Sequence, residues 1–547
     1  MERRALATFV ASIEPQAVAY PTERDSPWHE RAFPLLLVSA LTLFAAAVAG
    51  YHPYAEDGGL YMAGVERLLN PTLYPYGTAY VLEPMRHSLF ASTIAGAVRL
   101  THLPLPVVLL ALYMASIWAT LYAAWMLASR CWSSRRSRAG AVALLGCWLS
   151  LPIAGTALLF MDPYATARSF STPCMVLALA GALDMSANGG LDRKRLMRRG
   201  VLLWAISIVL AAAMHPLMAA YALGATLMLL ALRSPNRTLR LYGTAGLAAC
   251  AFTIADSLQV LAQPESADYL RVAMTRTYWF PAQWRWYELA GLAAPLAILT
   301  IYAWEQWIPG RRVLSMKANN ARQTLARMAI TVGTTSCLIA FVFARAASAT
   351  HFIARLQPLR AFQIVYLALI LTLGAQLGER LLRRRVWRWA GTILLLGGIM
   401  YSAARSAFPN SSHLELPWIT PQNQWVQAFF WIRNNTPVNA LFALDADYIN
   451  SQGEDAQCFR AIAQRSALAD YSKDGGEASI APELTEDWTR SQEAQQSLSA
   501  ASTSDAERLT ALRPLDVSWV VLQASAITRF ECPYNNSAVK VCKLRYQ

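Results

Sequence analysis

The chain of 547 residues is 55% hydrophobic and only 15% charged, with 18 tryptophans and a mean hydropathy of +0.29. This composition excludes an ordinary soluble protein and indicates a polytopic membrane protein. The formal charge of +14 does not predict a nucleic-acid partner, because Lys and Arg lie in short clusters between apolar segments, as the positive-inside rule describes.

The chain begins with a polar segment, residues 1–32, and its first apolar run spans about 33–50. No small-residue cleavage site accompanies this run, so we expect residues 1–32 to stay in the cytoplasm rather than to form a removed signal peptide. The first span then carries the following loop to the opposite, external face.

The stretch YHPYAEDGGLY, residues 51–61, follows this span and places two adjacent carboxylates, Glu56 and Asp57, at the membrane surface. The glycine pair after them permits a sharp turn or the close approach of a ligand. Such carboxylates are also common as solvated residues or helix caps, and composition alone favours that interpretation. The way in which the other segments of the chain are expected to face this stretch favours a functional site instead.

Residues 51–103 are only partly apolar, and the stretch 88–100 is shorter than the roughly 20 helical residues that cross a bilayer. We therefore expect two amphipathic helices on the external interface. If 88–100 were a crossing, the basic cluster RCWSSRRSR would lie outside, against the positive-inside rule.

Further apolar segments predict a transmembrane domain over residues 33–404. The expected spans are 104–128, 139–160, 170–187, 241–261, 289–307, 328–346, 362–378 and 389–404. The apolar stretch 201–232 is either a hairpin of two short spans, divided at His215-Pro216, or one long tilted helix. With the hairpin there are about eleven spans, and the main basic clusters lie on one side.

This topology gathers acidic, basic and histidine residues near the external face. They are Glu56, Asp57, Asp162, Arg168, His215, His351, Arg355 and Arg360. Guanidinium binds phosphate in a bidentate manner, so the three arginines are candidates for a lipid phosphate, although interfacial arginines also snorkel to headgroups. His215 is a weaker candidate, since a histidine beside a proline break is more often a helix-packing residue, and His351 is a further possible site residue.

From residue 405 to 547 the pattern changes to soluble sequence, and alternating helices and strands predict a small external, or periplasmic, α/β domain. WVQAFFWIRNN is typical of an amphipathic helix, and NALFALD and PLDVSWVVLQA are typical of strands. The terminal ECPYNNSAVKVC resembles a β-hairpin, and an oxidising compartment would allow Cys532 and Cys542 to pair.

Motifs of the common soluble enzymes are missing from the sequence. It has no Walker phosphate loop, no dinucleotide fingerprint, no GxSxG elbow and no zinc-ligand spacing. ATP-driven transport and serine hydrolysis therefore have no support.

The layout resembles the GT-C superfamily of polytopic glycosyltransferases over about residues 33–547. The resemblance rests on Glu56-Asp57 in a large first external loop, on Asp162 in the second, and on the external C-terminal domain. It implies a mainly α fold in the bacterial inner membrane, with a sugar transferred from a polyprenyl-phosphate donor to a glycan, lipid or protein acceptor. A WWDYG-like motif is absent from the C-terminal domain, which sets the chain apart from the oligosaccharyltransferase branch.

By this resemblance Asp57 or Glu56 is the catalytic base, and Asp162 is the next candidate. Glu56 then positions the base or shares a divalent metal ion with it, although the sequence identifies no cofactor. A transporter or lipid-handling protein without chemistry, and a noncatalytic scaffold, are the alternatives, since charged residues and a proline-broken helix also suit a substrate pathway. A lipid-sized groove leading to Asp57 would favour the transferase.

Overall fold

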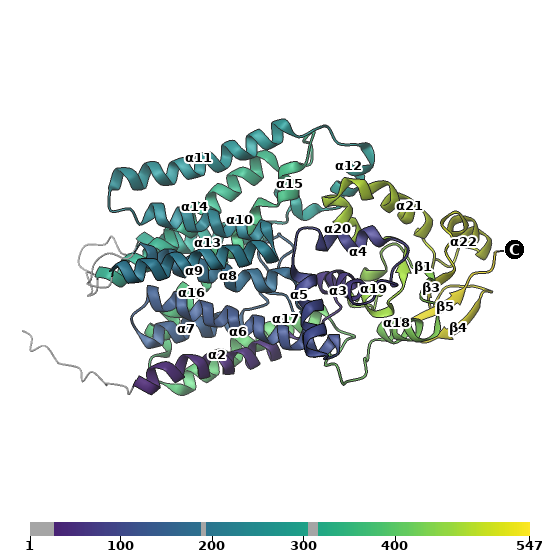
Figure 1. Ribbon diagram of the computed structural model, residues 1–547, viewed down its shortest axis with the longest axis horizontal. Coiled ribbons are helices and arrows are strands. Elements are labelled where there is room, and N and C mark those ends of the chain that lie inside the picture. The colour runs from purple at the N-terminus through teal and green to yellow at the C-terminus, as the bar shows by residue number, and fades with distance from the viewer. Residues whose placement is uncertain (1–26, 187–192, 305–315, 547) are drawn as a thin grey trace, which may run out of the picture.

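The computed structural model describes residues 27–186, 193–304 and 316–546. A bundle of long helices forms one part of the molecule, and the C-terminal α/β domain forms the other (Figure 1). The predicted mainly α fold with a small C-terminal α/β domain is confirmed. Most of the predicted cytoplasmic segment 1–32, and the ends of the predicted spans 170–187 and 289–307, lie outside the described residues.

The bundle is built from long apolar helices. They are α2 (Pro27–Ala49), α6 (Leu105–Cys131), α7 (Arg135–Cys147), α8 (Ala167–Met185), α9 (Arg193–Met214), α10 (Pro216–Leu232), α11 (Arg237–Leu261), α13 (Trp286–Trp304), α14 (Met316–Phe343), α16 (Phe362–Gln376) and α17 (Val386–Ala407). Seven helical segments in the described part are long and apolar enough to cross a membrane. The protein is a multi-pass membrane protein, and the count of eleven spans stays a prediction.

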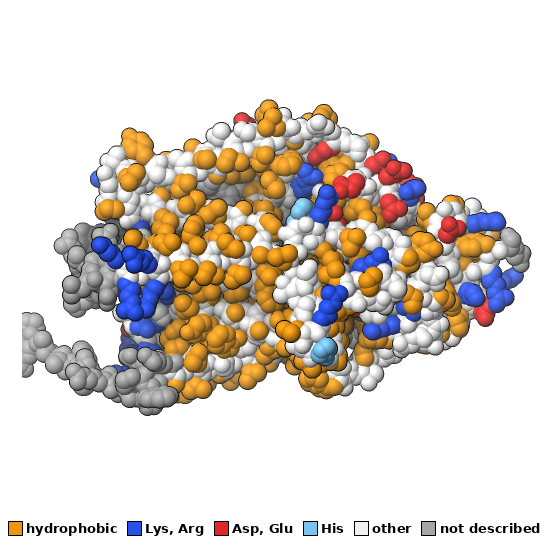
Figure 2. Space-filling view, in the orientation of Figure 1, with side chains coloured by type: hydrophobic (Ala, Val, Ile, Leu, Met, Phe, Trp, Pro, Cys, Tyr) orange, Lys and Arg blue, Asp and Glu red, His pale blue; other side chains and the backbone are white. Residues whose placement is uncertain are grey.

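The surface of the bundle agrees with this assignment. A broad hydrophobic band covers it, and Lys and Arg side chains gather at the end that lies away from the C-terminal domain (Figure 2). A basic end beyond an apolar band is the pattern that the positive-inside rule describes.

The hairpin interpretation of residues 201–232 is confirmed. Helices α9 and α10 meet at His215. Trp204 of α9 and Thr226 of α10 lie equally far from this break along the chain, and Trp204 Nε1 donates to Thr226 Oγ1 at 3.0 Å. At the far end, Arg233 donates to the carbonyl oxygen of Ser186 at 3.0 Å, so α10 ends where α8 ends. Two antiparallel helices explain both contacts, whereas one long helix would not.

The predicted span 139–160 is wrong in its second half. Helix α7 ends at Cys147, and residues 148–166 form irregular, mostly buried chain. Pro152 disfavours helix in the residue before it, and the chain reverses so that Ile153 N donates to Leu158 O at 2.8 Å. Irregular backbone is tolerated in a membrane protein where protein surrounds it, and this segment delivers Asp162 to the interior.

Residues 51–103, the loop that the sequence predicts to be external and that is called the first external loop below, carry α3 (Glu56–Leu69), α4 (Thr78–Leu82), η1 (Glu83–Met85) and α5 (Phe90–Thr101). Helices α3 and α5 match the two expected helices, and they lie between the bundle and the C-terminal domain (Figure 1). Met62 of α3 and Phe90 of α5 share a core with Phe429 and Phe459 of the C-terminal domain. The loop is therefore packed into a joint core, and its position on the membrane surface stays a prediction.

Shorter helices connect the larger elements of the bundle. They are α12 (Ala267–Met274), η2 (Thr277–Trp279), η3 (Pro281–Gln283), α15 (Phe352–Leu356), η5 (Pro358–Ala361) and η6 (Leu377–Leu382).

The C-terminal domain contains a five-stranded sheet in the order β2-β1-β3-β5-β4. Its strands are β1 (Leu441–Ala443), β2 (Ser466–Ala467), β3 (Trp519–Gln523), β4 (Glu531–Asn535) and β5 (Val539–Lys543). Its helices are α18 (Gln424–Asn435), η7 (Tyr448–Asn450), α19 (Phe459–Ala463), α20 (Lys473–Ile480), η8 (Pro482–Leu484), α21 (Thr485–Gln495), α22 (Asp505–Leu512) and η9 (Arg513–Leu515). Strand β1 pairs in parallel with β2 and β3, β4 and β5 form the expected terminal hairpin, and a disulfide joins Cys532 to Cys542.

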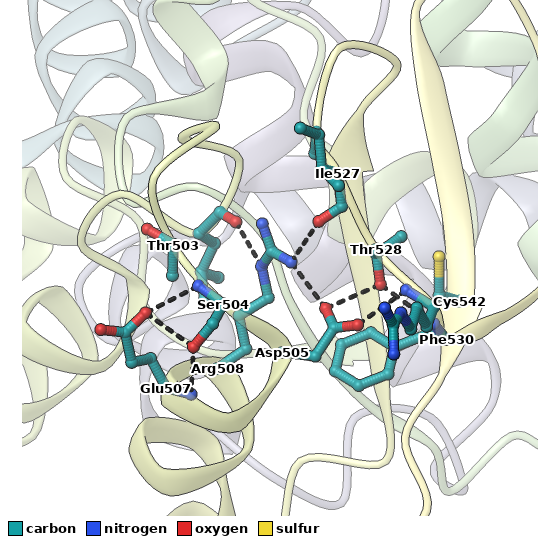
Figure 3. A network of polar contacts seen from close by, with 12 residues as sticks. Thr503, Ser504, Asp505, Glu507, Arg508, Ile527, Thr528, Phe530 and Cys542 are labelled. Atoms are coloured by element: carbon teal, nitrogen blue, oxygen red, sulfur yellow. Dashed lines mark hydrogen bonds and ion pairs between the residues drawn. The ribbon is translucent and has the colours of Figure 1, made fainter.

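A buried arginine fixes the outer part of this domain (Figure 3). Arg508 of α22 donates to Asp505 Oδ1 and to the carbonyl oxygens of Leu498 and Ile527, at 2.7 to 2.8 Å. Asp505 also accepts from Thr528 at 2.8 Å. Because charged hydrogen bonds replace its lost hydration, the buried guanidinium joins α22 to the loop before β4.

A second buried polar group, Glu66 of α3, ties the external loop to the C-terminal domain. One carboxyl oxygen lies 2.5 Å from the Tyr74 hydroxyl, and the other accepts from Gln464 at 2.8 Å. The Tyr74 hydroxyl has one proton but two acceptors, Glu66 and the carbonyl oxygen of Arg460 at 2.9 Å. Burial raises the pKa of Glu66 to about 7, and a protonated Glu66 that donates to Tyr74 satisfies every group.

We expect Glu66→Gln to make the protein less sensitive to alkaline pH. The folded pKa lies above the unfolded value of 4.5, so stability is full below pH 4.5 and falls as the pH rises to about 7. The free energy of unfolding should fall by at most about 3 kcal/mol over this pH range, which corresponds to about 2–4 °C in the melting midpoint. Thermal unfolding at pH 5 and pH 8 in one detergent should show a smaller decrease for Glu66→Gln than for the wild type or for Glu493→Gln, an exposed control. Equal decreases would contradict the protonated carboxyl.

Candidate active site

A cavity of about 860 Å³ lies where the bundle, the first external loop and the C-terminal domain meet. Its walls come from α3, η1, the irregular segment 148–166, α8, the break between α9 and α10, the α15–η5 region and α20. Of the eight candidates from the sequence, Glu56, Asp57, Asp162, Arg168, His215, Arg355 and Arg360 line this cavity. The structure therefore brings together residues that are far apart in the chain.

Asp57 lies in the first turn of α3, directly after Glu56. A helix N-terminus favours carboxylates because its free N–H groups carry partial positive charge. The glycine pair behind them permits close packing: a Cβ on Gly58 would lie 2.9 Å from the Tyr164 ring, and a Cβ on Gly59 would overlap Cys458. Helix α3 is therefore held against both the 148–166 segment and the C-terminal domain.

Two cations bridge three carboxylates around Asp57. Arg168 Nη2 lies 3.3 Å from Asp57 Oδ2 and 2.8 Å from Asp162 Oδ2. Lys473 Nζ lies 3.2 Å from Asp57 Oδ1 and contacts Glu56 Oε2. The cluster thus alternates negative and positive groups, and each Asp57 oxygen faces one cation.

These charges decide the protonation states. Burial raises the pKa of Asp57, but Lys473 and Arg168 outweigh burial and hold this pKa well below its usual range. Burial lowers the pKa of Lys473, but Glu56 and Asp57 outweigh burial and raise it. Asp162 differs, because burial keeps its pKa raised despite the contact with Arg168. Asp57 is an ionised carboxylate at neutral pH.

A second group of cavity residues carries unsatisfied polar atoms. Within the described residues, Arg360 Nε, His215 Nδ1 and Gln357 Oε1 are buried and have no hydrogen-bond partner. Buried polar atoms are almost always paired in folded proteins, and because these three side chains line the cavity, a ligand bound there is a candidate partner for them. Arg355 differs, because it already donates to the carbonyl oxygen of Ile480 at 3.3 Å and lies over Phe352.

The structure places His351 elsewhere, which corrects the expectation that it lies near the site. His351 does not line the cavity. Its Nδ1 and its backbone N both lie 2.6 Å from the Glu265 carboxyl, and its ring packs against Phe280. Burial lowers the pKa of His351, but Glu265 outweighs burial and raises it. This pair fastens the segment before α12 to the segment before α15.

No pattern in the sequence marks Lys473, the cavity residue of the C-terminal domain that contacts Asp57. It lies at the start of α20, in the stretch YSKDGGEAS, which carries no motif. Its contact with Asp57 joins residues 416 positions apart, and no local pattern predicts such a contact. Glu477, one turn further along α20, was missed for the same reason.

The charged cluster does not fit a divalent metal ion. The described residues contain no group of three or more His, Cys, Asp or Glu side chains that could hold a metal ion. The Asp57 oxygens contact Lys473 and Arg168, and Glu56 also contacts Lys473. A metal ion would have to displace these cations from the carboxylate oxygens.

Comparisons with known proteins give only distant similarity. No family model matches the chain, and no curated protein matches it. Among solved structures it is similar to the oligosaccharyltransferase AglB from Archaeoglobus fulgidus in complex with an inhibitory peptide and a dolichol-phosphate (TM-score 0.47, 12% identity, 91% of this chain and 70% of that chain). It is also similar to the arabinofuranosyltransferase AftD from Mycobacteria (TM-score 0.46, 16% identity, 91% of this chain and 37% of that chain).

We expect Gly59→Ala to weaken the attachment of α3 to the C-terminal domain. The new Cβ would overlap the Cβ of Cys458 and the carbonyl oxygen of Tyr54, and overpacking of this kind costs about 1–3 kcal/mol or more. Gly96→Ala in α5 is the matched control, because nothing lies within 4 Å of its new Cβ. Helix propensity favours alanine there by about 1 kcal/mol. Thermal unfolding should show a lower midpoint for Gly59→Ala only; unchanged midpoints for both would contradict the packing.

Proposed function

We propose that the chain is a membrane glycosyltransferase of the GT-C type, which moves a sugar from a polyprenyl-phosphate donor to an external acceptor. The arrangement around Asp57 carries this proposal. An ionised carboxylate, held by Lys473 and Arg168, shares one cavity with Arg360 and His215, whose buried nitrogen atoms lack partners. Glycosyl transfer from a lipid phosphate needs both a base and cationic groups for the leaving phosphate.

The proposed reaction is an inverting displacement. The acceptor hydroxyl oxygen forms a bond to the anomeric carbon while the bond from that carbon to the phosphate oxygen breaks. Asp57 takes the hydroxyl proton, and the electron pair of the broken bond stays on the lipid phosphate. Arg360 and Arg168 stabilise that phosphate through charge-assisted hydrogen bonds, and His215 contributes a further polar contact.

Asp57 can accept the proton without releasing its two cations. A carboxylate has about four lone-pair sites, and Lys473 and Arg168 occupy one on each oxygen. Two cations make Asp57 a weak base in the empty cavity. A bound lipid phosphate brings negative charge next to Arg168 and Arg360, which raises the proton affinity of Asp57 when the donor is in place.

Two further carboxyl groups position these cations. Asp162 holds Arg168 at 2.8 Å, and Glu56 holds Lys473. In this assignment Asp57 alone touches the reacting hydroxyl. Asp162 and Glu56 are positioning residues, which keep each cation at its Asp57 oxygen.

The position of the cavity suits a lipid-linked donor. Met214, Leu217 and Leu356 give it an apolar wall where it meets the bundle, which suits the first isoprene units. The basic end of the bundle lies away from the C-terminal domain, which supports a cytoplasmic face there and an external cavity (Figure 2).

We expect Asp57→Asn to abolish most of the transfer. The amide keeps the shape of the side chain but cannot take the proton, so the transfer rate should fall about 100-fold or more. Purified protein incubated with a panel of polyprenyl-phosphate sugars and acceptors measures the rate. Asp268→Asn, an exposed side chain of α12 that does not line the cavity, is the control and should leave the rate unchanged. An Asp57→Asn protein that folds and transfers at the wild-type rate would eliminate Asp57 as the base.

We expect Arg360→Ala to weaken donor binding rather than chemistry. A charge-assisted contact contributes about 1.5–3 kcal/mol, so the Kd for polyprenyl phosphate should rise about 10- to 100-fold. Arg271→Ala is the control, because Arg271 is exposed and does not line the cavity. Equal affinity in the wild type and Arg360→Ala would reject Arg360 as a phosphate ligand. Arg360-dependent binding without transfer to any acceptor would instead favour a lipid-handling protein.

A further inference from the structure

One face of helix α20 forms the wall of the cavity that the C-terminal domain contributes. Lys473, Gly476, Glu477 and Ile480 line the cavity, at the spacing of one helix face. The mechanism above uses Lys473 but leaves Glu477 without a role.

The bundle side of the molecule holds α20 firmly in this position. Arg276, from the segment between α12 and α13, donates to the carbonyl oxygens of Tyr471 at 2.9 Å and Ser472 at 2.7 Å. Tyr269 donates to the carbonyl oxygen of Ser479 at 2.9 Å, and Arg355 donates to that of Ile480 at 3.3 Å. Side chains on α20 are therefore placed by contacts at both of its ends, as binding residues need to be.

Glu477 is a buried carboxyl without a partner. The residue is 9% exposed, and within the described part of the chain no hydrogen bond or ion pair reaches its side chain. Lys473, the cation on the same helix, already forms ion pairs with Glu56 and Asp57. A buried acid that lines a cavity and lacks any partner is a group that a ligand satisfies.

The surroundings of Glu477 define the chemistry of that ligand. Glu83 of η1 lines the same cavity, with Arg86 at 3.5 Å from its carboxyl, and Arg276, Arg355 and Lys473 line the cavity as well. At Glu477 itself the negative charges of Asp57, Glu83 and Asp474 act against Lys473 alone, which disfavours an anion next to this carboxyl. Burial, and then the charges of Asp57 and Glu83, raise the pKa of Glu477 well above its usual range. A protonated carboxyl both donates and accepts a hydrogen bond, and so does a sugar hydroxyl.

We propose that Glu477 and Glu83 form a carbohydrate subsite, which binds the hydroxyl groups of a neutral glycan acceptor. The acceptor assignment rests on the proposed glycosyl transfer, whereas carbohydrate binding at Glu477 does not depend on it. The two carboxyls come from the external loop and the C-terminal domain, and the phosphate-binding candidates Arg360 and His215 come from the bundle. An acceptor that arrives from the external side meets Glu477 and Glu83, while the lipid phosphate meets the arginines.

Direct binding to the full chain in lipid nanodiscs tests the subsite without any transfer reaction. The probes are methyl glycosides of neutral hexose and pentose disaccharides, with an amino-sugar and a uronic-acid disaccharide as charged counterparts, followed by saturation-transfer NMR. At least one neutral disaccharide should bind. Glu477→Ala should weaken it about 10-fold or more, whereas Glu477→Gln, which still donates and accepts, should stay within about 3-fold of the wild type. Glu483→Gln is the control, since that exposed carboxyl does not line the cavity.

Several outcomes would overturn the subsite. If the amino-sugar disaccharide binds best and both Glu477 variants lose this binding, the site binds cations rather than neutral sugars. If the uronic-acid disaccharide binds as well as the neutral one, the site does not select against anions. A Glu477→Ala protein that loses affinity for a polyprenyl-phosphate sugar but not for the disaccharide would assign Glu477 to the donor sugar. Thermal unfolding of both variants identifies a folding defect, and the Gln variant preserves volume and hydrogen bonding.

The same experiment separates this proposal from the proposed function. If no disaccharide binds while polyprenyl phosphate still binds in an Arg360-dependent way, the subsite is rejected and the transferase stands. If disaccharides bind through Glu477 but no polyprenyl phosphate binds, the subsite stands and the lipid-linked donor is rejected.

Discussion

The site depends on a chain of alternating charges that runs from Glu56 through Lys473, Asp57 and Arg168 to Asp162. Its members come from the first external loop, the irregular 148–166 segment, the start of α8 and the C-terminal domain. Removing Arg168 would leave Asp162, whose side chain is 5% exposed, without its cation, and breaking a buried ion pair is strongly destabilising. The relative position of these parts and the ionised state of Asp57 are therefore set by the same contacts.

A gain in stability does not by itself explain why a protein contains buried ion pairs. Taking several charged groups out of water costs more than their attraction returns unless the geometry is good, and apolar side chains of similar size are often at least as stable. The joint core of Met62, Phe90, Phe429 and Phe459 already attaches the external loop to the C-terminal domain. The charged cluster is better explained by chemistry, since it keeps one carboxylate ionised inside the cavity.

The sequence predicts what depends on local patterns. Apolar length and basic clusters predict the membrane class, His215-Pro216 predicts the hairpin of α9 and α10, and alternation predicts the strands of the C-terminal domain. The 139–160 span failed because an apolar run does not reveal where the chain reverses inside protein. Lys473 and Glu477 were missed because their roles come from contacts with residues hundreds of positions away, as the 416-residue separation of Lys473 from Asp57 illustrates.

The irregular segment and the close packing of α3 serve one geometric requirement. A continuous helix over 139–160 would carry Asp162 beyond the end of the bundle, whereas the reversal at Pro152 returns the chain so that Asp162 meets Arg168 at 2.8 Å. From the other direction, Gly58 and Gly59 let α3 approach Tyr164 and Cys458 more closely than any residue with a Cβ permits. Asp57 thereby reaches the same guanidinium nitrogen, Nη2, at 3.3 Å, and one arginine links the two carboxyls that the sequence placed in separate external loops.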